Sequence, residues 1–235
     1  MNLIKYESRF KAGEILEKFI KTNDIEFFNK INRNFKNTFC YAIPNGGVPV
    51  AEGFCSQLNI KYDILIVRKL KIPYNTEAGF GALTTDGTVF FNRPLLNQLG
   101  LTEEQINISI SITKEEINQR IKYYGKELNL TQKLSENIQN KDIFLIDDGL
   151  ASGFTMLAGI NMIKKYQPNS VSIAVPTAPL RTITFMGKEV DNIFCPNIRN
   201  VSWFAVADSY KHWYDIPEQE VLEIINNSKY YIYNI

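Results

Sequence analysis

Two adjacent acidic residues, Asp147 and Asp148, stand where a short apolar run ends and a loop of small residues begins. The run 143–146 has the length of a buried strand, and apolar residues at helical spacing follow from residue 156 onward. Paired carboxylates at the end of a strand suit two vicinal hydroxyls or a hydrated Mg²⁺. The pattern therefore predicts that Asp147 and Asp148 bind a diol, a Mg²⁺ ion or both.

The loop after the acidic pair has the composition of an anion site. Its glycines let the backbone come close to a ligand, and its hydroxyl side chains add donors. Backbone N–H groups ahead of a helix converge with the positive end of the helix dipole. The alternative is an ordinary strand–turn–helix connection. We predict a phosphate-binding loop of seven residues, Gly149, Leu150, Ala151, Ser152, Gly153, Phe154 and Thr155. Together, this loop and the acidic pair predict that the ligand is a sugar phosphate.

A second loop, Pro44-Asn45-Gly46-Gly47, also follows an expected strand and opens an expected helix. Its N–H groups form a second candidate anion cradle, with a plain tight turn as the alternative. The neutral amide of Asn45 can donate a hydrogen bond but cannot neutralise the charge of an anion. We predict that Asn45, Gly46 and Gly47 bind a second anionic group.

Two basic residues, Arg68 and Lys69, come directly after an expected strand at 63–67. Ligands of open α/β sheets bind beyond the carboxyl ends of the strands, so both side chains are predicted to face the same crevice as the two loops. A solvated Lys/Arg pair is the alternative. The polar segment 70–78 that follows is predicted to be a mobile lid.

Composition narrows the class of protein. The chain has 235 residues, and its 26 basic and 25 acidic residues give no overall field that would attract nucleic acid or an anionic membrane. Its three cysteines have no metal-ligand spacing, and their odd number argues against a disulfide framework. No apolar run has the length of a signal core or a membrane span, so we expect a cytoplasmic protein.

Strands alternating with helices predict a doubly wound α/β fold with a parallel sheet. The expected strands are 39–43, 63–67, 143–146, 171–175 and 191–195, with a hairpin at 79–92, and the expected helices are 9–35, 48–58, 102–124, 154–166 and 179–187. We expect a single domain over 1–235, with a lid insertion at about 70–130. A hood is expected from the terminal segments, its C-terminal part at about 196–235. The aromatic segment 230–233 is predicted to form an extra strand or an interface.

The segment 143–155 resembles the phosphoribosyl pyrophosphate (PRPP) signature of the type I phosphoribosyltransferases: a hydrophobic run, two acidic residues, and a loop ending in Ser-Gly-x-Thr. A receiver domain has its Asp pair near its beginning and lacks such a loop, and the Gly-Lys-Ser/Thr of a Walker loop is absent from the chain. Weaker matches to a stand-alone branch of unassigned acceptor include Tyr6-x-x-Arg9, Gly46-Gly47-Val48-Pro49 and Arg120-x-x-x-Tyr124.

The resemblance implies that Asp147 and Asp148 hold the ribose hydroxyls and Mg²⁺, and that the 149–155 loop holds the 5′-phosphate. It implies that the 45–47 loop, Arg68 and Lys69 receive the pyrophosphate, with Arg68, Lys69 and the acidic pair as catalytic residues. The activity implied is Mg²⁺-dependent transfer of phosphoribose from PRPP to a nitrogenous acceptor, with release of pyrophosphate. A homodimer is compatible with it.

Two departures from the family pattern bear on the activity. Asn45 stands where the family usually has Arg or Lys, which points to slow turnover and allows a non-catalytic PRPP- or nucleotide-binding regulator as the alternative. Ala151 replaces a carboxylate found in relatives that act on 6-oxopurines, so such acceptors are disfavoured. A hydrolase that uses water as the acceptor is a third reading. The only histidine, His212, is expected to be a packed or surface aromatic residue rather than an acid or base.

Overall fold

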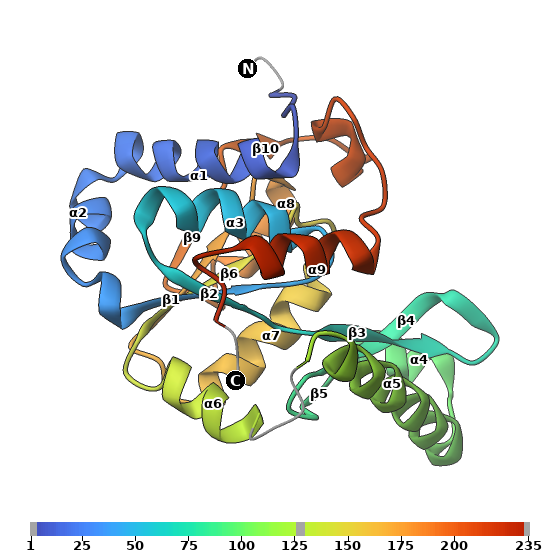
Figure 1. Cartoon of the computed structure of the whole chain (residues 1–235). Helices are drawn as coiled ribbons and strands as arrows, with labels where there is room; N and C mark the ends of the chain where they lie inside the picture. The colour runs from blue at the N-terminus through green and yellow to red at the C-terminus, as the bar shows by residue number, and fades with distance from the viewer. Residues whose placement is uncertain (1–3, 126–129, 233–235) are drawn as a thin grey trace.

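A five-stranded parallel sheet forms the centre of the chain (Figure 1). The computed structural model describes residues 4–125 and 130–232. The strand order is β2-β1-β6-β7-β9, and the strands are β1 (Thr38–Ala42), β2 (Lys61–Ile64), β6 (Asp142–Ile146), β7 (Ser170–Ala174) and β9 (Asn192–Phe194). All four pairings are parallel. The predicted doubly wound α/β fold is confirmed.

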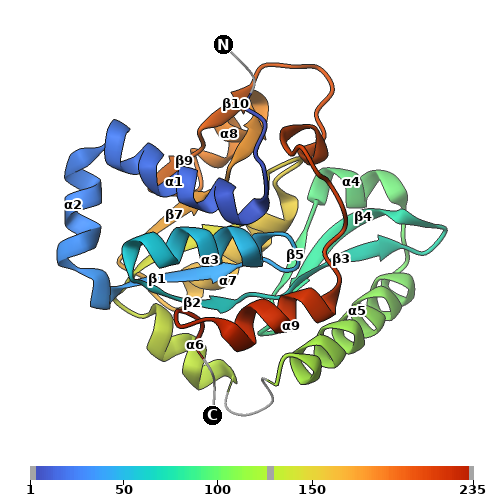
Figure 2. The ribbon, with the colours of Figure 1, turned by 45° about the horizontal axis from the view of Figure 1, so that its top comes forward.

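Helices cover both faces of this sheet, as Figure 2 shows. Side chains alternate between the faces: Phe144 and Ile146 of β6 join one core, and Ile143 and Leu145 join the other. The first core lies under α1 (Arg9–Asn23), α2 (Ile25–Arg33), α3 (Gly47–Leu58) and α9 (Glu218–Asn227), and the second under α6 (Leu130–Ile138) and α7 (Phe154–Lys165). Burial on both faces explains why these strands read as continuous apolar runs.

The expected helix 9–35 is divided in two. Asp24 ends α1 and caps α2, because its carboxylate accepts a hydrogen bond from the Phe27 N–H at 3.0 Å. A 3₁₀ turn, η1 (Phe35–Asn37), then leads into β1. The expected helix 102–124 is α5 (Glu103–Tyr123), and Thr102 and Gln105 form a capping box at its start.

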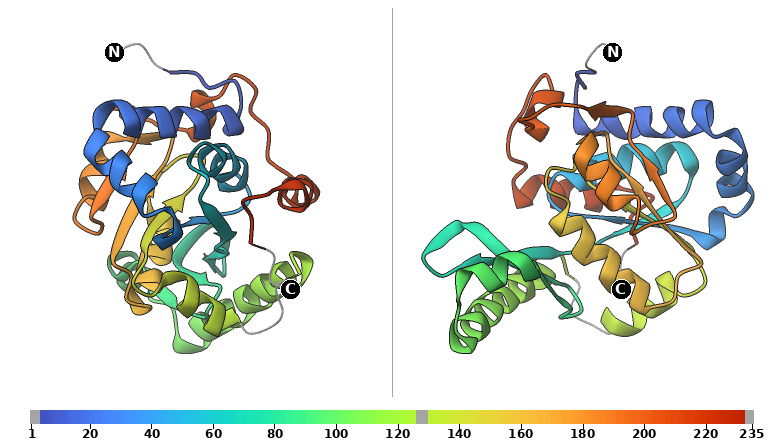
Figure 3. Two further views of the ribbon diagram at one scale, coloured as in Figure 1. Left: turned by 60° about the vertical axis from the view of Figure 1, so that its left-hand side comes forward. Right: turned by 180° about the vertical axis from the view of Figure 1, so that it is seen from behind.

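A second, antiparallel sheet projects from one side of the molecule (Figures 1 and 3). It contains β3 (Val67–Ile72), β4 (Asn75–Thr84) and β5 (Val89–Phe91), and α4 (Arg93–Leu99) and α5 follow it in the chain. The predicted strand 63–67 was therefore wrong: β2 stops at Ile64, and Arg68 and Lys69 lie inside β3. The segment 70–78 was predicted to be a mobile lid. Its residues 70–72 and 75–78 lie in β3 and β4, and 73–74 form the turn of this hairpin.

The terminal segments meet beside the carboxyl ends of the parallel strands, in a region that we call the hood. The Tyr6 N–H donates to the Ser209 carbonyl at 2.8 Å, and the Lys211 N–H donates to the Tyr6 carbonyl at 2.9 Å. The hood also contains β8 (Thr177–Pro179), α8 (Leu180–Met186), β10 (Asn197–Arg199) and η2 (Val206–Ser209), with β8 and β10 paired in parallel.

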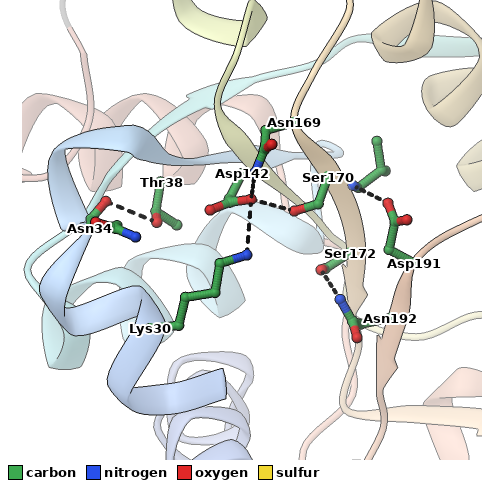
Figure 4. A network of polar contacts seen from close by, with 10 residues as sticks. Lys30, Asn34, Thr38, Asp142, Asn169, Ser170, Ser172, Asp191 and Asn192 are labelled. Carbon is green, nitrogen blue, oxygen red and sulfur yellow. Dashed lines mark hydrogen bonds and ion pairs between the residues drawn. The ribbon is translucent and has the colours of Figure 1, made fainter. Parts of the chain in front are cut away.

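The opposite ends of the strands are held by a polar network (Figure 4). Asp142 Oδ1 accepts hydrogen bonds from Asn169 Nδ2 and Ser170 Oγ, both at 2.6 Å, and lies 3.5 Å from Lys30 Nζ. Asp191 accepts from the Val171 N–H at 2.7 Å. These polar groups bind one another, so their role is to fix the amino ends of β6, β7 and β9.

The aromatic segment at 230–232 adds to the edge of the parallel sheet. The Tyr62 N–H donates to the Tyr230 carbonyl, and the Ile232 N–H donates to the Tyr62 carbonyl, each at 3.0 Å. This pairing is an isolated β-bridge between Tyr62 and Tyr231, short of the predicted extra strand, and Tyr233 lies outside the described part of the chain. Among the helices of 4–125 and 130–232, none combines the length and apolar character needed to cross a membrane.

Candidate active site

The two predicted loops meet at the carboxyl ends of β1 and β6. A Cβ atom on Gly46 would lie 2.1 Å from Asp148 Oδ2, and one on Gly47 would lie 2.7 Å from the Ile146 carbonyl oxygen. Any side chain at either position would collide with the other loop. The paired glycines are therefore required by this close approach, which brings the 44–47 loop against the acidic pair.

The acidic pair is half-buried and tightly held. Asp147 Oδ1 accepts from the Asp148 N–H at 2.8 Å, and Asp148 Oδ2 accepts from Arg9 Nε at 2.7 Å. Burial and the neighbouring Asp148 charge raise the pKa of Asp147 well above its ordinary value. Burial also raises the pKa of Asp148, against the opposing effect of Arg9. Two such carboxylates favour the binding of a cation or of hydroxyl donors.

Arg9 connects this pair to the hood. Its guanidinium carbon lies 4.1 Å from the centre of the Trp213 ring and 5.3 Å from that of Tyr210. Tyr210 in turn donates its hydroxyl to the Asp148 carbonyl at 2.6 Å. Sequence reasoning did not propose Arg9 as a site residue; its one signal was the Tyr6-x-x-Arg9 match at the start of the chain.

A cavity of about 330 Å³ opens in front of the acidic pair. Three guanidinium groups reach it, from Arg9, Arg68 and Arg120. Nε of Arg68 is buried and has no hydrogen-bond partner among the described residues, so it is available to an anion. The other lining residues are Pro44, Asn45, Gly46, Asp147, Asp148, Trp213, Asp215 and Ile216.

The Asn45 side chain is held on both sides. Its Nδ2 donates to the Ile216 carbonyl at 2.7 Å, and its Oδ1 accepts from Arg120 Nη1 at 2.9 Å. The peptide bond between Pro44 and Asn45 is cis. The uncharged side chain of Asn45 thus has a cation beside it, the guanidinium of Arg120 in α5. Sequence reasoning missed this role of Arg120, whose one signal was the Arg120-x-x-x-Tyr124 match.

The phosphate-type loop lies on the other side of the acidic pair. Gly153 has φ +83° and precedes the first residue of α7, a conformation that favours glycine. The Leu150 side chain is buried and its N–H donates to the Thr177 carbonyl at 2.9 Å, while Thr182 Oγ1 donates to the Ala151 carbonyl at 2.6 Å. Leu150 therefore anchors the loop through its N–H instead of offering that group to a ligand. Ala151, Ser152 and Thr155 are exposed.

Arg68 and Lys69 do not face the same space. Lys69 lines a separate cavity of about 190 Å³, together with Ser152, Phe154 and Thr155 of the loop. Successive side chains of a strand point to opposite faces, so placing both residues in β3 separates them. The structure brings Arg68 to the acidic pair and Lys69 to the 149–155 loop. His212 lines a third cavity, beside Tyr214 and Glu52.

The donor set fits a magnesium–substrate complex. Mg²⁺ in phosphate sites is usually bound by one or two carboxylates, with the remaining positions filled by water and substrate oxygens. Asp147 and Asp148 supply two such groups, at a place where negative charge is disfavoured without a cation. No group of three or more metal-ligating side chains occurs among the described residues.

The comparisons with known proteins agree with this geometry. A family model described as "Phosphoribosyl transferase domain" matches residues 12–214. The chain belongs to this family. Two Mycobacterium tuberculosis proteins, from strains H37Rv (Rv0571c) and CDC 1551 (MT0597), carry the provisional name of phosphoribosyl transferase. Each is 25% identical to this phosphoribosyl transferase family member over 189 residues, or 79% of this chain and 41% of the relative. The chain thus spans about two fifths of the length of these curated relatives.

A solved structure shares the fold. The protein TT1426 from Thermus thermophilus matches with a TM-score of 0.71 and 20% identity, over 94% of this chain and 97% of that protein. The family match and this shared architecture identify the fold as that of a type I phosphoribosyltransferase. The 149–155 loop, the acidic pair and the 44–47 loop all lie within the matched residues.

Proposed function

We propose that this protein transfers the 5-phosphoribosyl group of PRPP to a nitrogenous acceptor and releases pyrophosphate. The observation that carries the proposal is the position of Asp147 and Asp148 between two loops. The 44–47 loop lies against Asp148, and the 149–155 loop continues from the acidic pair. PRPP has two anionic ends on either side of a ribose diol, so its three parts match this order.

Each part of the site has a role in the proposed reaction. Asp147 and Asp148 accept hydrogen bonds from the ribose 2′- and 3′-hydroxyls. They would also hold Mg²⁺, which would supply positive charge to neutralise the leaving pyrophosphate. The 149–155 loop holds the 5′-phosphate, and Lys69 beside it adds a positive charge. The backbone at Gly46, with Arg68, receives the pyrophosphate. The Gly47 N–H donates to the Ile43 carbonyl at 3.0 Å, so Gly47 contributes the close approach of the loop to β6 and not a free donor.

The chemical step breaks the bond between ribose C1 and the pyrophosphate oxygen and forms a bond from C1 to the acceptor nitrogen. The bonding electrons leave with pyrophosphate, and the acceptor nitrogen gives its proton to water or a base. Positive charge develops at C1, so the protein contributes mainly by orientation and electrostatics. Trp213 at the cavity wall offers an aromatic face for a flat acceptor. The buried free thiols of Cys40, Cys55 and Cys195 suit a reducing compartment, and we assign the reaction to the cytoplasm.

Pyrophosphate release from Mg²⁺–PRPP, measured with and without a panel of nucleobases, tests the proposal. Release that depends on one base, with formation of the matching nucleotide, is the expected result. Release without any base would instead identify a hydrolase. Binding of PRPP by calorimetry with no release under any condition would identify a non-catalytic regulator. A fourth result, no binding at all, would remove the site assignment itself.

A further inference from the structure

Arg120 lies where three parts of the molecule meet. It comes from α5, which belongs to the projecting part of the chain. Its Nη1 donates to Asn45 in the 44–47 loop at 2.9 Å, and its Nη2 lies 2.7 Å from Glu218 Oε1 at the start of α9. The Arg120 side chain is only 18% exposed. The guanidinium is therefore fixed in place at the wall of the 330 Å³ cavity.

The 44–47 loop has no cation of its own, because it consists of proline, asparagine and two glycines. The three guanidinium groups of the cavity differ in their partners. Arg9 is paired with Asp148, Arg68 has an unpartnered Nε among the described residues, and Arg120 is paired with Glu218. Of the three, Arg120 is the one with a hydrogen bond to the loop. It is thus the cation best placed for an anion that binds against the loop backbone.

We propose that Arg120 is a second pyrophosphate-binding cation beside Arg68, positioned by Asn45, and that Glu218 is an internal competitor for it. The Asn45 amide oxygen holds one guanidinium nitrogen, which leaves the rest of the planar group to face a ligand. The Glu218 carboxylate occupies that part in the unliganded chain and stands in for a diphosphate oxygen. Because Glu218 is 34% exposed, its ion pair is weak and a multiply charged anion displaces it.

This inference rests on the proposed function, and binding measurements separate the two. Calorimetry with Mg²⁺–pyrophosphate and with Mg²⁺–PRPP is run on wild type and three variants. Arg120→Gln keeps hydrogen-bonding capacity but removes the charge, and should weaken pyrophosphate binding roughly 10- to 100-fold. Arg120→Lys keeps the charge without the planar fork and should lose less. Glu218→Gln should tighten binding roughly two- to fivefold, a gain that a misfolded variant cannot produce.

Glu14→Gln is the matched control. It removes one negative charge from an ion pair with Lys11 on the outer part of α1, and pyrophosphate affinity should stay at the wild-type value. Wild-type affinity in folded Arg120→Gln would overturn the inference, as would a Glu218→Gln affinity no higher than that of the control. In either case the proposed function stands if wild type binds both ligands. If wild type binds neither ligand, the proposed function fails, and the inference about Arg120 fails with it.

Discussion

Arg9 and Asp148 are 139 residues apart in the sequence, yet Arg9 Nε lies 2.7 Å from Asp148 Oδ2. Both side chains are largely shielded from water, with 6% and 14% exposed. One ion pair therefore joins the first helix to the end of the central strand, and Trp213 covers its outer side. The candidate ligand-binding carboxylate is thus also a structural contact of the hood.

Breaking this ion pair should destabilise the fold. Arg9→Met removes the partner of a shielded carboxylate, and we expect the free energy of unfolding to fall by about 3 kcal/mol. Urea unfolding followed by circular dichroism measures the change. Lys11→Met is the control, because Lys11 is 57% exposed in its pair with Glu14 and should change stability by less than about 1 kcal/mol. Equal losses in both variants would show that Asp148 does not depend on Arg9.

Neutralising Asp147 should separate stability from function. Asp147→Asn removes the charge repulsion with Asp148 and keeps an amide oxygen to accept the Asp148 N–H. We expect a higher free energy of unfolding than wild type at neutral pH, and PRPP affinity lower by at least roughly tenfold. Urea unfolding and calorimetry on the same protein give both numbers. Unchanged PRPP affinity in the folded variant would contradict the assignment of Asp147.

The stability gain should depend on pH. Because the pKa of Asp147 is raised in the folded protein, the folded state binds more protons than the unfolded state above the ordinary Asp value of about 4. The free energy of unfolding of the wild type therefore falls as the pH rises from about 4 to the raised pKa of Asp147. The difference between Asp147→Asn and wild type should grow over this range and then become constant. A difference independent of pH would show that the carboxyl pKa is not raised.

Gly46→Ala should disrupt the contact between the two loops. The new methyl group would lie 2.1 Å from Asp148 Oδ2, so the 44–47 loop must move away from the acidic pair. We expect a loss of about 1–3 kcal/mol in stability and a loss of pyrophosphate binding. Thermal unfolding and calorimetry check both. At Gly187, whose φ is −61°, a Cβ would come no closer than 3.3 Å to a neighbouring atom, so Gly187→Ala is the control and should keep wild-type affinity.

The β3–β4 hairpin should show a rigid base and a mobile tip. Leu70 and Ile72 are buried, and the Ser109 hydroxyl donates to the Lys71 carbonyl at 3.0 Å. The base of the hairpin is therefore anchored, whereas the sequence predicted a mobile segment over all of 70–78. Beyond the base, the strand register shifts on both sides of Lys71. Hydrogen exchange should be slow at 70–72 and fast at 73–78 in the free protein, with 73–78 slowing on addition of Mg²⁺–PRPP. Equal exchange with and without ligand would rule out a lid.

The central sheet could be predicted from the sequence because its signals are local. The run 143–146 is apolar, short and followed by turn residues, and the same holds for 39–43 and 171–175. The strand at 63–67 could not be placed correctly from such a run. The Thr85 hydroxyl accepts a hydrogen bond from the Ile66 N–H and donates one to the Ile66 carbonyl. Ile66 therefore pairs with neither sheet, and the strand is divided into β2 and β3 at this point. That contact spans 19 residues and leaves no local pattern.

Site residues that are consecutive in the chain could be predicted from the sequence. Site residues that only the tertiary fold brings together were missed. The acidic pair and the 149–155 loop are consecutive, so their chemistry is visible in the sequence. Arg120 reaches Asn45 from 75 residues away, and Arg9 reaches Asp148 from the first helix. The sequence showed an uncharged residue at position 45 and provided no means of seeing the cation beside it.

The pairing of Tyr62 with the 230–232 segment also bears on self-association. An uncovered edge strand presents a row of free N–H and C=O groups, which can recruit a strand from another molecule. Residues 230–232 occupy this position beside β2, and the centre of the Tyr231 ring lies 5.5 Å from that of Tyr62. This short segment thereby shields one edge of the sheet from a neighbouring molecule, although it lies far from the acidic pair in the sequence.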